Sequence, residues 1–475
     1  MNMRISVIGT GYLGATHAAC LAELGFEVLG VDSDPEKVAL LSRGIAPFSE
    51  PGLDELLTRH VGTGRLRFTT DLREAADFAD VHFVCVGTPQ SRSALSADVS
   101  AVFAVVRGLA EAVTRDCLVI GKSTVPVGTA ATLADEVATL VPPGVTAEVA
   151  WNPEFLREGH GVEDTLHPDR LVFGVSTPAA EVTLRRVYER PLAAGVPVHV
   201  TDVATAELAK VAANAFLATK ISFINAMAEV SDRSGADVVA LADVLGDDTR
   251  IGRRFLDAGI GFGGGCLPKD IRAFSARATE LGAHSVAGLL NEVDSINVRA
   301  RQRTVDLATE LCGSDLRGRR VAVLGAAFKP LSDDVRNSPA LHVAGQLHLR
   351  GAEVRVYDPE ASNNARAVFP ALTYVAGIDA ALTDADLVLH LTEWPQFREI
   401  DPHRAARLVR SPRMIDGRNR LDQERWLRAG WDFHGVGRGT QPRVHSPAAV
   451  ARSLPLQART TGDRGLSLDG LLDLA

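Results

Sequence analysis

The chain has 475 residues, of which 46% are apolar and 23% charged, a composition typical of a soluble globular protein. At roughly 150 residues per domain, this length predicts about three domains. The formal net charge of −9 leaves no basic excess, so neither nucleic acid nor an anionic membrane surface is an expected partner.

The amino terminus and the cysteines favour the cytoplasm. Residues 1–8 run directly into an apolar, strand-like segment, without the order of basic, apolar and small residues found in a secretory signal. No apolar run approaches the ~20 residues of a membrane span. The five cysteines are scattered and lack metal-ligand spacing, so we expect reduced thiols and no metal. Four of them have the apolar or helix-end surroundings of packing residues: Cys20, Cys85, Cys117 and Cys312.

The first two hundred residues alternate short β-branched runs with helical stretches, which predicts βαβ units around a parallel sheet. A long, alanine-rich helical stretch follows from about residue 201 to 230, and a second spans about 286–311. A loop rich in Gly and Arg, residues 246–270, separates them. We therefore expect an all-helical middle domain.

The strand pattern returns near residue 320 and repeats the beginning of the chain. Residues 4–9, 25–32 and 79–84 are echoed, in the same order, by residues 320–325, 351–358 and 385–390. Three ordered echoes predict two related doubly wound domains. The expected fold is α/β, with two Rossmann-like domains joined by a central helical domain. Its expected parts are residues 1–200, 201–312 and 313–440, followed by a loosely ordered tail over 441–475.

A dinucleotide site is predicted at the start of the chain. Gly9, Gly11 and Gly14 form a Gly-x-Gly-x-x-Gly motif between a strand and a helical stretch, and Asp32 ends the next strand. The glycines allow pyrophosphate to approach a helix N-terminus. Asp32 would bind the adenosine ribose and repel a 2′-phosphate, which favours NAD over NADP. The alternative is a purely structural glycine turn. His17, in the helix that follows, is interpreted as a packing residue.

The third domain does not keep this motif. Residues 325–330 lack the second and third glycines, and Lys329 lies where a phosphate would be expected. This domain either binds a different phosphorylated ligand or is an empty duplicate.

The segment Gly-Phe-Gly-Gly-Gly-Cys-Leu-Pro-Lys-Asp, residues 261–270, is the strongest candidate for chemistry. Its glycines let the backbone approach a ligand, and they leave Cys266 accessible. N–H groups, Lys269 or Arg250 would lower the pKa of this thiol, and Asp270 would orient a water molecule or another side chain. The alternative is a flexible linker with an incidental thiol.

Two further sets of residues become candidates beside Cys266. Lys210 and Asn214 lie one helical turn apart, with Glu207 next to them, and would stabilise a developing oxyanion; the alternative is a solvated helix face. Thr124 and Glu154 follow predicted strands at the ligand-binding edge of the sheet, where they would handle protons or position water. Their alternative is a role as helix caps.

Together these motifs resemble the UDP-glucose/GDP-mannose dehydrogenase family over about residues 1–440. The resemblance is carried, in chain order, by the glycine motif, Ser-Thr-Val-Pro at 123–126, Asn-Pro-Glu-Phe-Leu-Arg-Glu-Gly at 152–159, Lys-Val-Ala-Ala-Asn at 210–214, the segment 261–270 and Ala-Phe-Lys-Pro at 327–330. One departure is Gly265, where many members have serine.

The resemblance implies roles for individual residues. Cys266 would be the nucleophile, Lys210 and Asn214 the oxyanion stabilisers, and Thr124, Glu154 and Asp270 the residues around a hydrolytic water. The implied NAD contacts are Gly9, Gly11, Tyr12, Leu13, Gly14, Asp32, Lys37, Thr88, Thr124, Glu158 and Arg336. The implied nucleotide-sugar contacts are Glu154, Phe155, Leu156, Lys210, Asn214, Arg250, Phe262, Gly263, Phe328, Lys329 and Arg418. A homodimer through the central helical domain is also implied.

The expected reaction is the double oxidation of a nucleotide-sugar primary alcohol to a carboxylate by two NAD, with UDP-glucose as the expected substrate. Within the family, GDP-mannose or a UDP-N-acetylhexosamine are alternatives that these motifs do not separate. A two-electron hydroxyacid dehydrogenase is a further alternative, but it leaves Cys266 without a role. A non-enzymatic NAD-binding regulator would need none of residues 124, 154, 210 and 266.

Overall fold

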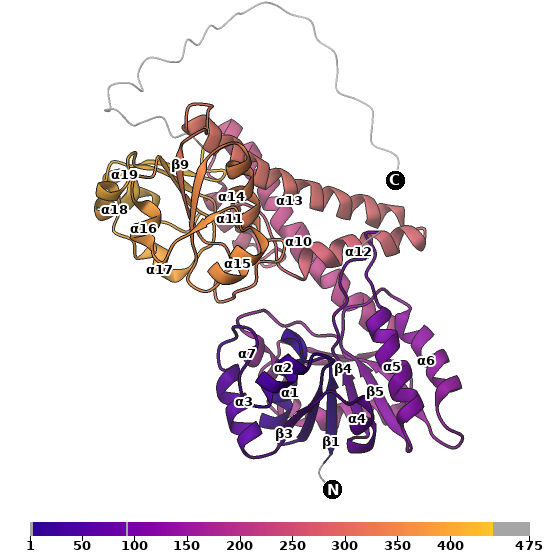
Figure 1. Cartoon of the computed structure of the whole chain (residues 1–475). Helices are drawn as coiled ribbons and strands as arrows, with labels where there is room; N and C mark the ends of the chain where they lie inside the picture. Colours follow the sequence, from indigo (N-terminus) through magenta and orange to yellow (C-terminus); the bar gives the residue numbers. More distant parts are fainter. Residues whose placement is uncertain (1–2, 92–93, 440–475) are drawn as a thin grey trace, which may run out of the picture. The chain divides into compact units, whose positions relative to one another are not determined.

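The computed structural model of the protein describes residues 3–91 and 94–439 (Figure 1). The expected tail over 441–475 lies outside the described residues. Two parallel-stranded sheets, each covered by helices, belong to the two ends of the described chain, and long helices form the middle.

The first sheet has eight strands in the order β3-β2-β1-β4-β5-β6-β7-β8. All its neighbouring pairs are parallel except β6 and β7, which pair antiparallel at Trp151 and Gly174; this pair departs from the expected parallel sheet. The strands are β1 Arg4–Ile8, β2 Glu27–Val31, β3 Leu66–Thr69, β4 Val81–Val84, β5 Cys117–Gly121, β6 Ala147–Trp151, β7 Leu171–Gly174 and β8 Val198–Thr201.

Alternate residues of these strands enter two separate apolar clusters, one on each face of the sheet. Val28 and Phe83 pack with α1 (Tyr12–Glu23) and α3 (Leu53–Gly62). Their chain neighbours Leu29 and Val84 pack with α4 (Leu72–Phe78), α5 (Ser100–Ala112) and α6 (Thr129–Leu140). Burial on both faces explains why the strands read as continuous apolar runs. The helices are α1 Tyr12–Glu23, α2 Pro35–Leu41, α3 Leu53–Gly62, α4 Leu72–Phe78, α5 Ser100–Ala112, α6 Thr129–Leu140, α7 Gly161–Leu166, α8 Pro178–Val187 and α9 Glu189–Ala193.

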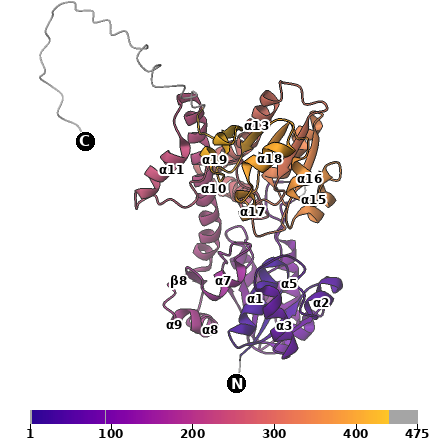
Figure 2. The same ribbon diagram turned by 90° about the vertical axis from the view of Figure 1, so that its left-hand side faces the viewer.

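The middle of the chain is helical, as expected, and Figure 2 shows α10 as one unbroken helix. Its elements are α10 Val203–Ser234, α11 Val238–Asp247, α12 Leu267–Glu280 and α13 His284–Leu311. The expected loop over 246–270 is too long, because α12 already begins at Leu267, with Pro268 in its first turn. Among the described residues, α10 is the helix long and apolar enough by composition to cross a membrane. It packs against α12 and α13 as a core helix of this domain.

The third part contains a six-stranded parallel sheet of order β11-β10-β9-β12-β13-β14. The sequence echoes fall on equivalent strands: β9 corresponds to β1, β10 to β2 and β12 to β4. The prediction of two related doubly wound domains is therefore confirmed. The elements are β9 Arg320–Leu324, α14 Pro339–Leu349, β10 Glu353–Tyr357, α15 Ser362–Val368, β11 Thr373–Tyr374, α16 Ile378–Leu382, β12 Leu387–His390, α17 Pro395–Arg398, α18 Pro402–Leu408, β13 Arg413–Asp416, α19 Gln423–Arg428 and β14 Asp432–Gly435.

Candidate active site

The glycine motif forms the turn from β1 into α1. A Cβ on Gly14 would lie 1.8 Å from the carbonyl oxygen of Gly9, whereas Gly11 faces open space. Among the residues that the structure describes, no side chain caps the N-terminus of α1 and no acid lies in its first turn, so its N–H groups can receive an anion. This geometry fits a dinucleotide pyrophosphate.

Asp32, at the end of β2, lies beside this turn. One of its oxygens accepts hydrogen bonds from Thr10 N at 2.9 Å and from Lys37 Nζ at 2.9 Å. Burial opposes ionisation of Asp32, but the Lys37 ammonium and backbone N–H groups hold its pKa below the ordinary value. An ionised carboxylate at this position suits a ribose diol.

Tyr12 connects the glycine motif to the segment before α7. Its hydroxyl donates to Glu50 and accepts from Gly159 N at 2.8 Å. Glu50 in turn accepts from Gly159 N at 2.7 Å and from Gly161 N at 2.6 Å. Glu50 was not predicted from the sequence, because it lies in the loop before α3 and belongs to no motif.

The equivalent carboxylate in the third domain has different hydrogen-bond partners. Asp358 follows β10 as Asp32 follows β2, but it accepts from Ala326 N at 2.7 Å, Ala327 N at 2.9 Å and Trp394 Nε1 at 3.1 Å. Asp358 is 2% exposed, against 9% for Asp32. The site of this domain therefore differs from that of the first domain.

Lys210 and Glu154 form the buried centre of the candidate active site. Lys210 Nζ, on α10, lies 2.8 Å from Glu154 Oε1, three residues after β6. Glu154 also accepts from Leu156 N at 2.6 Å. Burial opposes the charge on both groups, yet the pair keeps the pKa of Glu154 low and that of Lys210 high. Both are therefore charged at neutral pH.

A second set of polar contacts brings Asn214, Asp270 and the first domain together. Asn214 Nδ2 donates to Asp270 Oδ2 at 2.7 Å, and Lys269 Nζ lies 2.6 Å from Asp270 Oδ1. Lys269 also donates to Thr88 Oγ1 at 3.4 Å, and Thr88 donates to the Thr124 carbonyl at 2.7 Å. Residues from three separate motifs, together with Thr88, thus form one chain of contacts.

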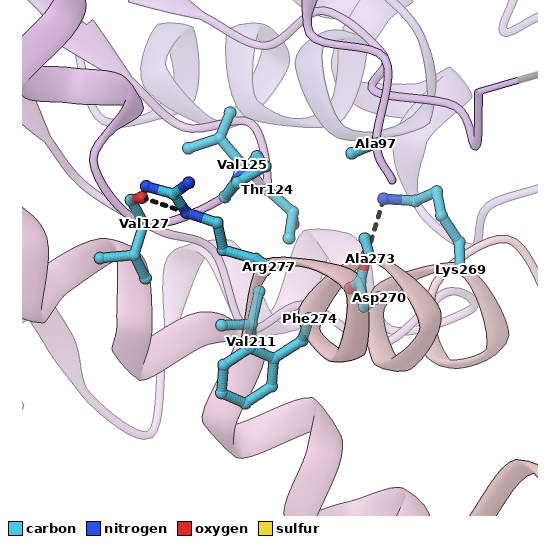
Figure 3. Close-up of a pocket in the computed structure, with 11 residues that line it drawn as sticks. Ala97, Thr124, Val125, Val127, Val211, Lys269, Asp270, Ala273, Phe274 and Arg277 are labelled. Carbon is cyan, nitrogen blue, oxygen red and sulfur yellow. Dashed lines mark hydrogen bonds and ion pairs between the residues drawn. The ribbon is translucent and has the colours of Figure 1, made fainter. Parts of the chain in front are cut away.

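A pocket opens beside these contacts (Figure 3). It lies between the loop 124–127 and one side of α12, and Arg277 closes one end by donating to the Val127 carbonyl at 3.0 Å. Glu207, one turn before Lys210, supports the same loop by accepting from Gly128 N and Ala130 N at 2.7 and 2.6 Å. Thr124 and Asp270 both face this pocket.

Cys266 directly precedes α12, and its side chain reaches solvent. The protein around it raises the pKa of the thiol to about 12, and the Lys210 ammonium acts in the opposite direction. The prediction that Lys269 or Arg250 lowers this pKa is therefore wrong. Lys269 pairs with Asp270, and Arg250, in the loop after α11, is exposed and pairs with Asp248 at 2.6 Å.

The glycines before Cys266 allow the third domain to approach closely. A Cβ on Gly263 would lie 2.4 Å from the Asn337 carbonyl, and one on Gly264 would lie 2.8 Å from the Phe328 ring. A Cβ on Gly265 would lie 2.3 Å from the guanidinium carbon of Arg336. The serine that many members of the family have at this position would therefore require Arg336 to shift.

Two asparagines hold the backbone that leads to Cys266. Asn297, on α13, accepts from Phe262 N at 2.8 Å and donates to Phe262 O at 3.1 Å, and Asn225, on α10, accepts from Gly259 N at 2.9 Å. Sequence reasoning missed both, because a buried asparagine in a long helix leaves no local pattern.

The other predicted contacts lie where the first and third domains meet the loop. Glu158 pairs with Arg336 at 3.2 Å, and its carbonyl accepts from Lys329. Arg418 donates to Gly261 O at 3.0 Å and to Phe328 O at 3.2 Å. The Phe155 ring lies under Arg170 and beside Lys210, 3.8 and 5.7 Å from their charged atoms.

The family models of the UDP-glucose/GDP-mannose dehydrogenase family match three parts of the chain. The NAD binding domain matches residues 3–192, the central domain 204–299 and the UDP binding domain 322–423. The chain belongs to the UDP-glucose/GDP-mannose dehydrogenase family. Its glycine turn and Asp32 are accordingly those of an NAD-binding domain, and NAD is the cofactor.

Individual relatives of this family cover nearly the whole chain. UDP-glucose 6-dehydrogenase TuaD of Bacillus subtilis is 40% identical over 444 residues, 92% of this chain and 95% of that protein. The structure of a UDP-glucose dehydrogenase from Pyrobaculum islandicum has a TM-score of 0.85 at 40% identity, covering 92% and 98% of the two chains. A UDP-D-ManNAc dehydrogenase from Pyrococcus horikoshii has a TM-score of 0.81 at 28% identity, covering 92% and 99%.

Proposed function

We propose that this chain is a UDP-glucose 6-dehydrogenase, which oxidises UDP-glucose to UDP-glucuronate. The observation that carries the proposal is the convergence of Lys210, Asn214, Glu154 and Asp270 beside Cys266. A simple alcohol dehydrogenase needs no nucleophile, whereas oxidation to an acid gains from a covalent thioester. Relatives about 40% identical over nearly the whole chain favour UDP-glucose as the substrate.

The glycine turn and Asp32 would hold NAD, which would supply the hydride acceptor for two successive oxidations at the sugar C6. In the first oxidation, C6 loses a hydride and its hydroxyl loses a proton. Cys266 adds across the aldehyde formed by the first, with sulfur to carbon and the thiol proton to oxygen. This thiohemiacetal loses a hydride and a proton in the second oxidation and becomes a thioester. Lys210 and Asn214 stabilise the negative charge that develops on the C6 oxygen.

Hydrolysis of the thioester is assigned to Glu154, with Thr124 and Asp270 positioning the water. Glu154 is held ionised by Lys210, so it can accept a proton from the attacking water. The C–S bond then breaks, the sulfur regains a proton, and the acid is released. The UDP part is assigned to the third domain, with Phe328, Lys329 and Arg418 as proposed contacts.

The stoichiometry of the reaction tests this function. With limiting UDP-glucose, two NADH should form per sugar consumed, with UDP-glucuronate as the product. A ratio of one, with an aldehyde or ketone product, would identify a two-electron dehydrogenase. Parallel assays with GDP-mannose and UDP-N-acetylhexosamines decide the substrate. If one of these is oxidised in preference to UDP-glucose, that nucleotide sugar is the substrate instead.

The proposed assembly is a cytoplasmic homodimer through the central helices, with residues 1–200, 201–312 and 313–440 as its domains. Exposed apolar side chains recur on α10 every seven or eight residues, which places them along one face of the helix: Leu208, Phe216, Phe223 and Val230. Light scattering of wild-type protein and of Phe216→Asp tests this surface. A monomeric wild-type protein would contradict the dimer.

A further inference from the structure

A buried lysine lies directly behind the candidate active site. Lys122 follows β5, and its side chain is 6% exposed. Its ammonium nitrogen lies 3.0 Å from Asn152 Oδ1 and 3.3 Å from the Tyr188 hydroxyl, and the Phe83 and Tyr188 rings flank it at 5.9 and 5.8 Å. The mechanism described above gives this group no role.

Within the described parts of the chain, Lys122 forms no ion pair with a carboxylate. An ammonium taken out of water without a counter-ion is strongly unfavourable, and a methionine would fill the same space without that cost. A buried, unpaired charge next to a reaction centre therefore calls for a functional explanation.

Lys122 fixes the strand end that carries Glu154. Asn152, two residues before Glu154, accepts from both Lys122 and the Tyr188 hydroxyl, the latter at 2.6 Å. Its amide donates to the Val172 carbonyl at 2.9 Å. The side chain of Asn152 is therefore held by three elements of the first domain.

Lys122 also supplies a charge. Burial alone would favour the protonated form of Glu154, and the pKa of this carboxyl is nevertheless lowered, first by Lys210 and then by the Leu156 N–H and Lys122. Lys210 also acts on Cys266 and is assigned to the oxyanion, whereas Lys122 contacts the carbonyl and side-chain oxygens of Asn152. Its field on Glu154 persists through the whole reaction.

We propose that Lys122 is a positioning residue for thioester hydrolysis: its buried ammonium orders the Asn152–Glu154 strand end and keeps the Glu154 carboxylate ionised. This inference rests on the proposed function, because it assigns Lys122 to a step of that reaction.

Most of the titratable groups around Lys122 are neutral, so few other charges act on Glu154. His17 on α1 is fully buried, which lowers its pKa well below the ordinary value and leaves it neutral. Burial raises the pKa of Cys85, after β4, to about 12, and also raises that of the Tyr188 hydroxyl. Burial lowers the pKa of Lys122 itself to about 8, which leaves it mostly protonated below that pH. The remaining charged neighbours are Glu154 and Lys210.

The test compares three variants by the pH dependence of thioester hydrolysis. Lys122→Met removes the charge and the hydrogen bonds, and Lys122→Gln removes the charge but keeps a donor toward Asn152. Tyr188→Phe removes a hydrogen bond to Asn152 and keeps the charge. Acyl-enzyme formed from NAD and UDP-glucose is quenched at intervals and measured by intact mass at pH 5 to 8, a range that is about the working span of a carboxylate base.

In both Lys122 variants, the acid limb of the pH–rate profile for thioester hydrolysis should move to higher pH by about half to one unit, because Glu154 loses a neighbouring positive charge. Tyr188→Phe should leave the limb in place. Unchanged limbs in the Lys122 variants, or an equal shift in Tyr188→Phe, would overturn the proposed role of the charge. If Lys122→Met does not fold, Lys122→Gln decides alone. Wild-type protein that never forms a thioester would instead refute the proposed function.

Discussion

Asn214 on α10 donates a hydrogen bond of 2.7 Å to Asp270 in the first turn of α12. Asp270 is 2% exposed, and its other oxygen is paired with Lys269. The carboxylate thus fixes the orientation of the Asn214 amide beside Cys266, and it links the central helices to Thr88 of the first domain through Lys269.

Replacing Asp270 with asparagine should therefore damage catalysis more than substrate binding. The variant loses the charge that holds Lys269 and one acceptor for Asn214. We expect kcat to fall by about 10²–10³-fold, with a small change in the KM for UDP-glucose. Steady-state NADH kinetics measure both. Asp294→Asn is the matched control, because it breaks the Arg272 pair between α12 and α13 away from Cys266 and should keep near-normal kcat.

Cys266→Ala and Glu154→Gln should fail at different steps. The alanine variant removes the nucleophile, so overall oxidation should drop by several orders of magnitude (roughly 10³-fold or more) while NAD and UDP-glucose affinities change little. The glutamine variant should still form the thioester but hydrolyse it slowly. Intact mass spectrometry should find a sugar-acyl adduct on Cys266 that hydroxylamine removes. Acid production at a near-normal rate by Cys266→Ala would refute the covalent mechanism.

Cofactor choice should depend on Asp32 and not on its counterpart Asp358. NADP should be a poor substitute for NAD, and Asp32→Ser should narrow the difference in kcat/KM between them. Asp358→Ser removes the equivalent carboxylate from the third domain, where it accepts hydrogen bonds from Ala326 N and Trp394 Nε1. It should lower thermal stability and leave the cofactor ratio unchanged. Equal rates with both cofactors in the wild type would mean that Asp32 does not contact the ribose.

The buried pair of His390 and Asp416 should make the third domain sensitive to acid. Burial opposes ionisation of Asp416, but the contact with His390 Nδ1 at 2.7 Å and backbone N–H donors hold its pKa below the ordinary value. A lowered pKa means that its contribution to stability is complete above the unfolded value, about 3.9, and is lost as pH falls through the folded value.

Asp416→Asn should therefore destabilise the protein by about 2–4 kcal/mol at pH 7, and the difference from wild type should shrink below about pH 4. Thermal unfolding between pH 3 and 7 measures it. Asp432→Asn, an exposed change on the neighbouring strand β14, serves as the control and should have little effect. A constant difference across this pH range would show that the charge of Asp416 is not responsible.

The features that depend on residues close together in the sequence could be predicted. The glycine motif, the alternation of strands and helices, and the cysteine segment 261–270 each depend on neighbours in the sequence. Glu50, Lys122 and Asn297 could not be found this way, because each acts on a partner brought near only by folding: Gly159 is 109 residues from Glu50. The direction of the Cys266 pKa was mispredicted for the same reason: the protein that folding packs around the thiol raises its pKa more than the Lys210 ammonium lowers it.

Helix α10 contributes residues to several parts of the site along its length. Glu207 supports the start of α6, Lys210 and Asn214 face the reacting groups, Asn225 holds Gly259, and Ala228 packs under Gly437 beyond β14. From Glu207 to Ala228 this helix spans about 31 Å. A single residue inserted between Asn214 and Asn225 would turn one end of the helix relative to the other by about 100°. Only the residues on one side of the insertion could then keep their partners. The helical register of α10 therefore fixes which way these side chains point. The length of the helix is as constrained as the identity of Cys266.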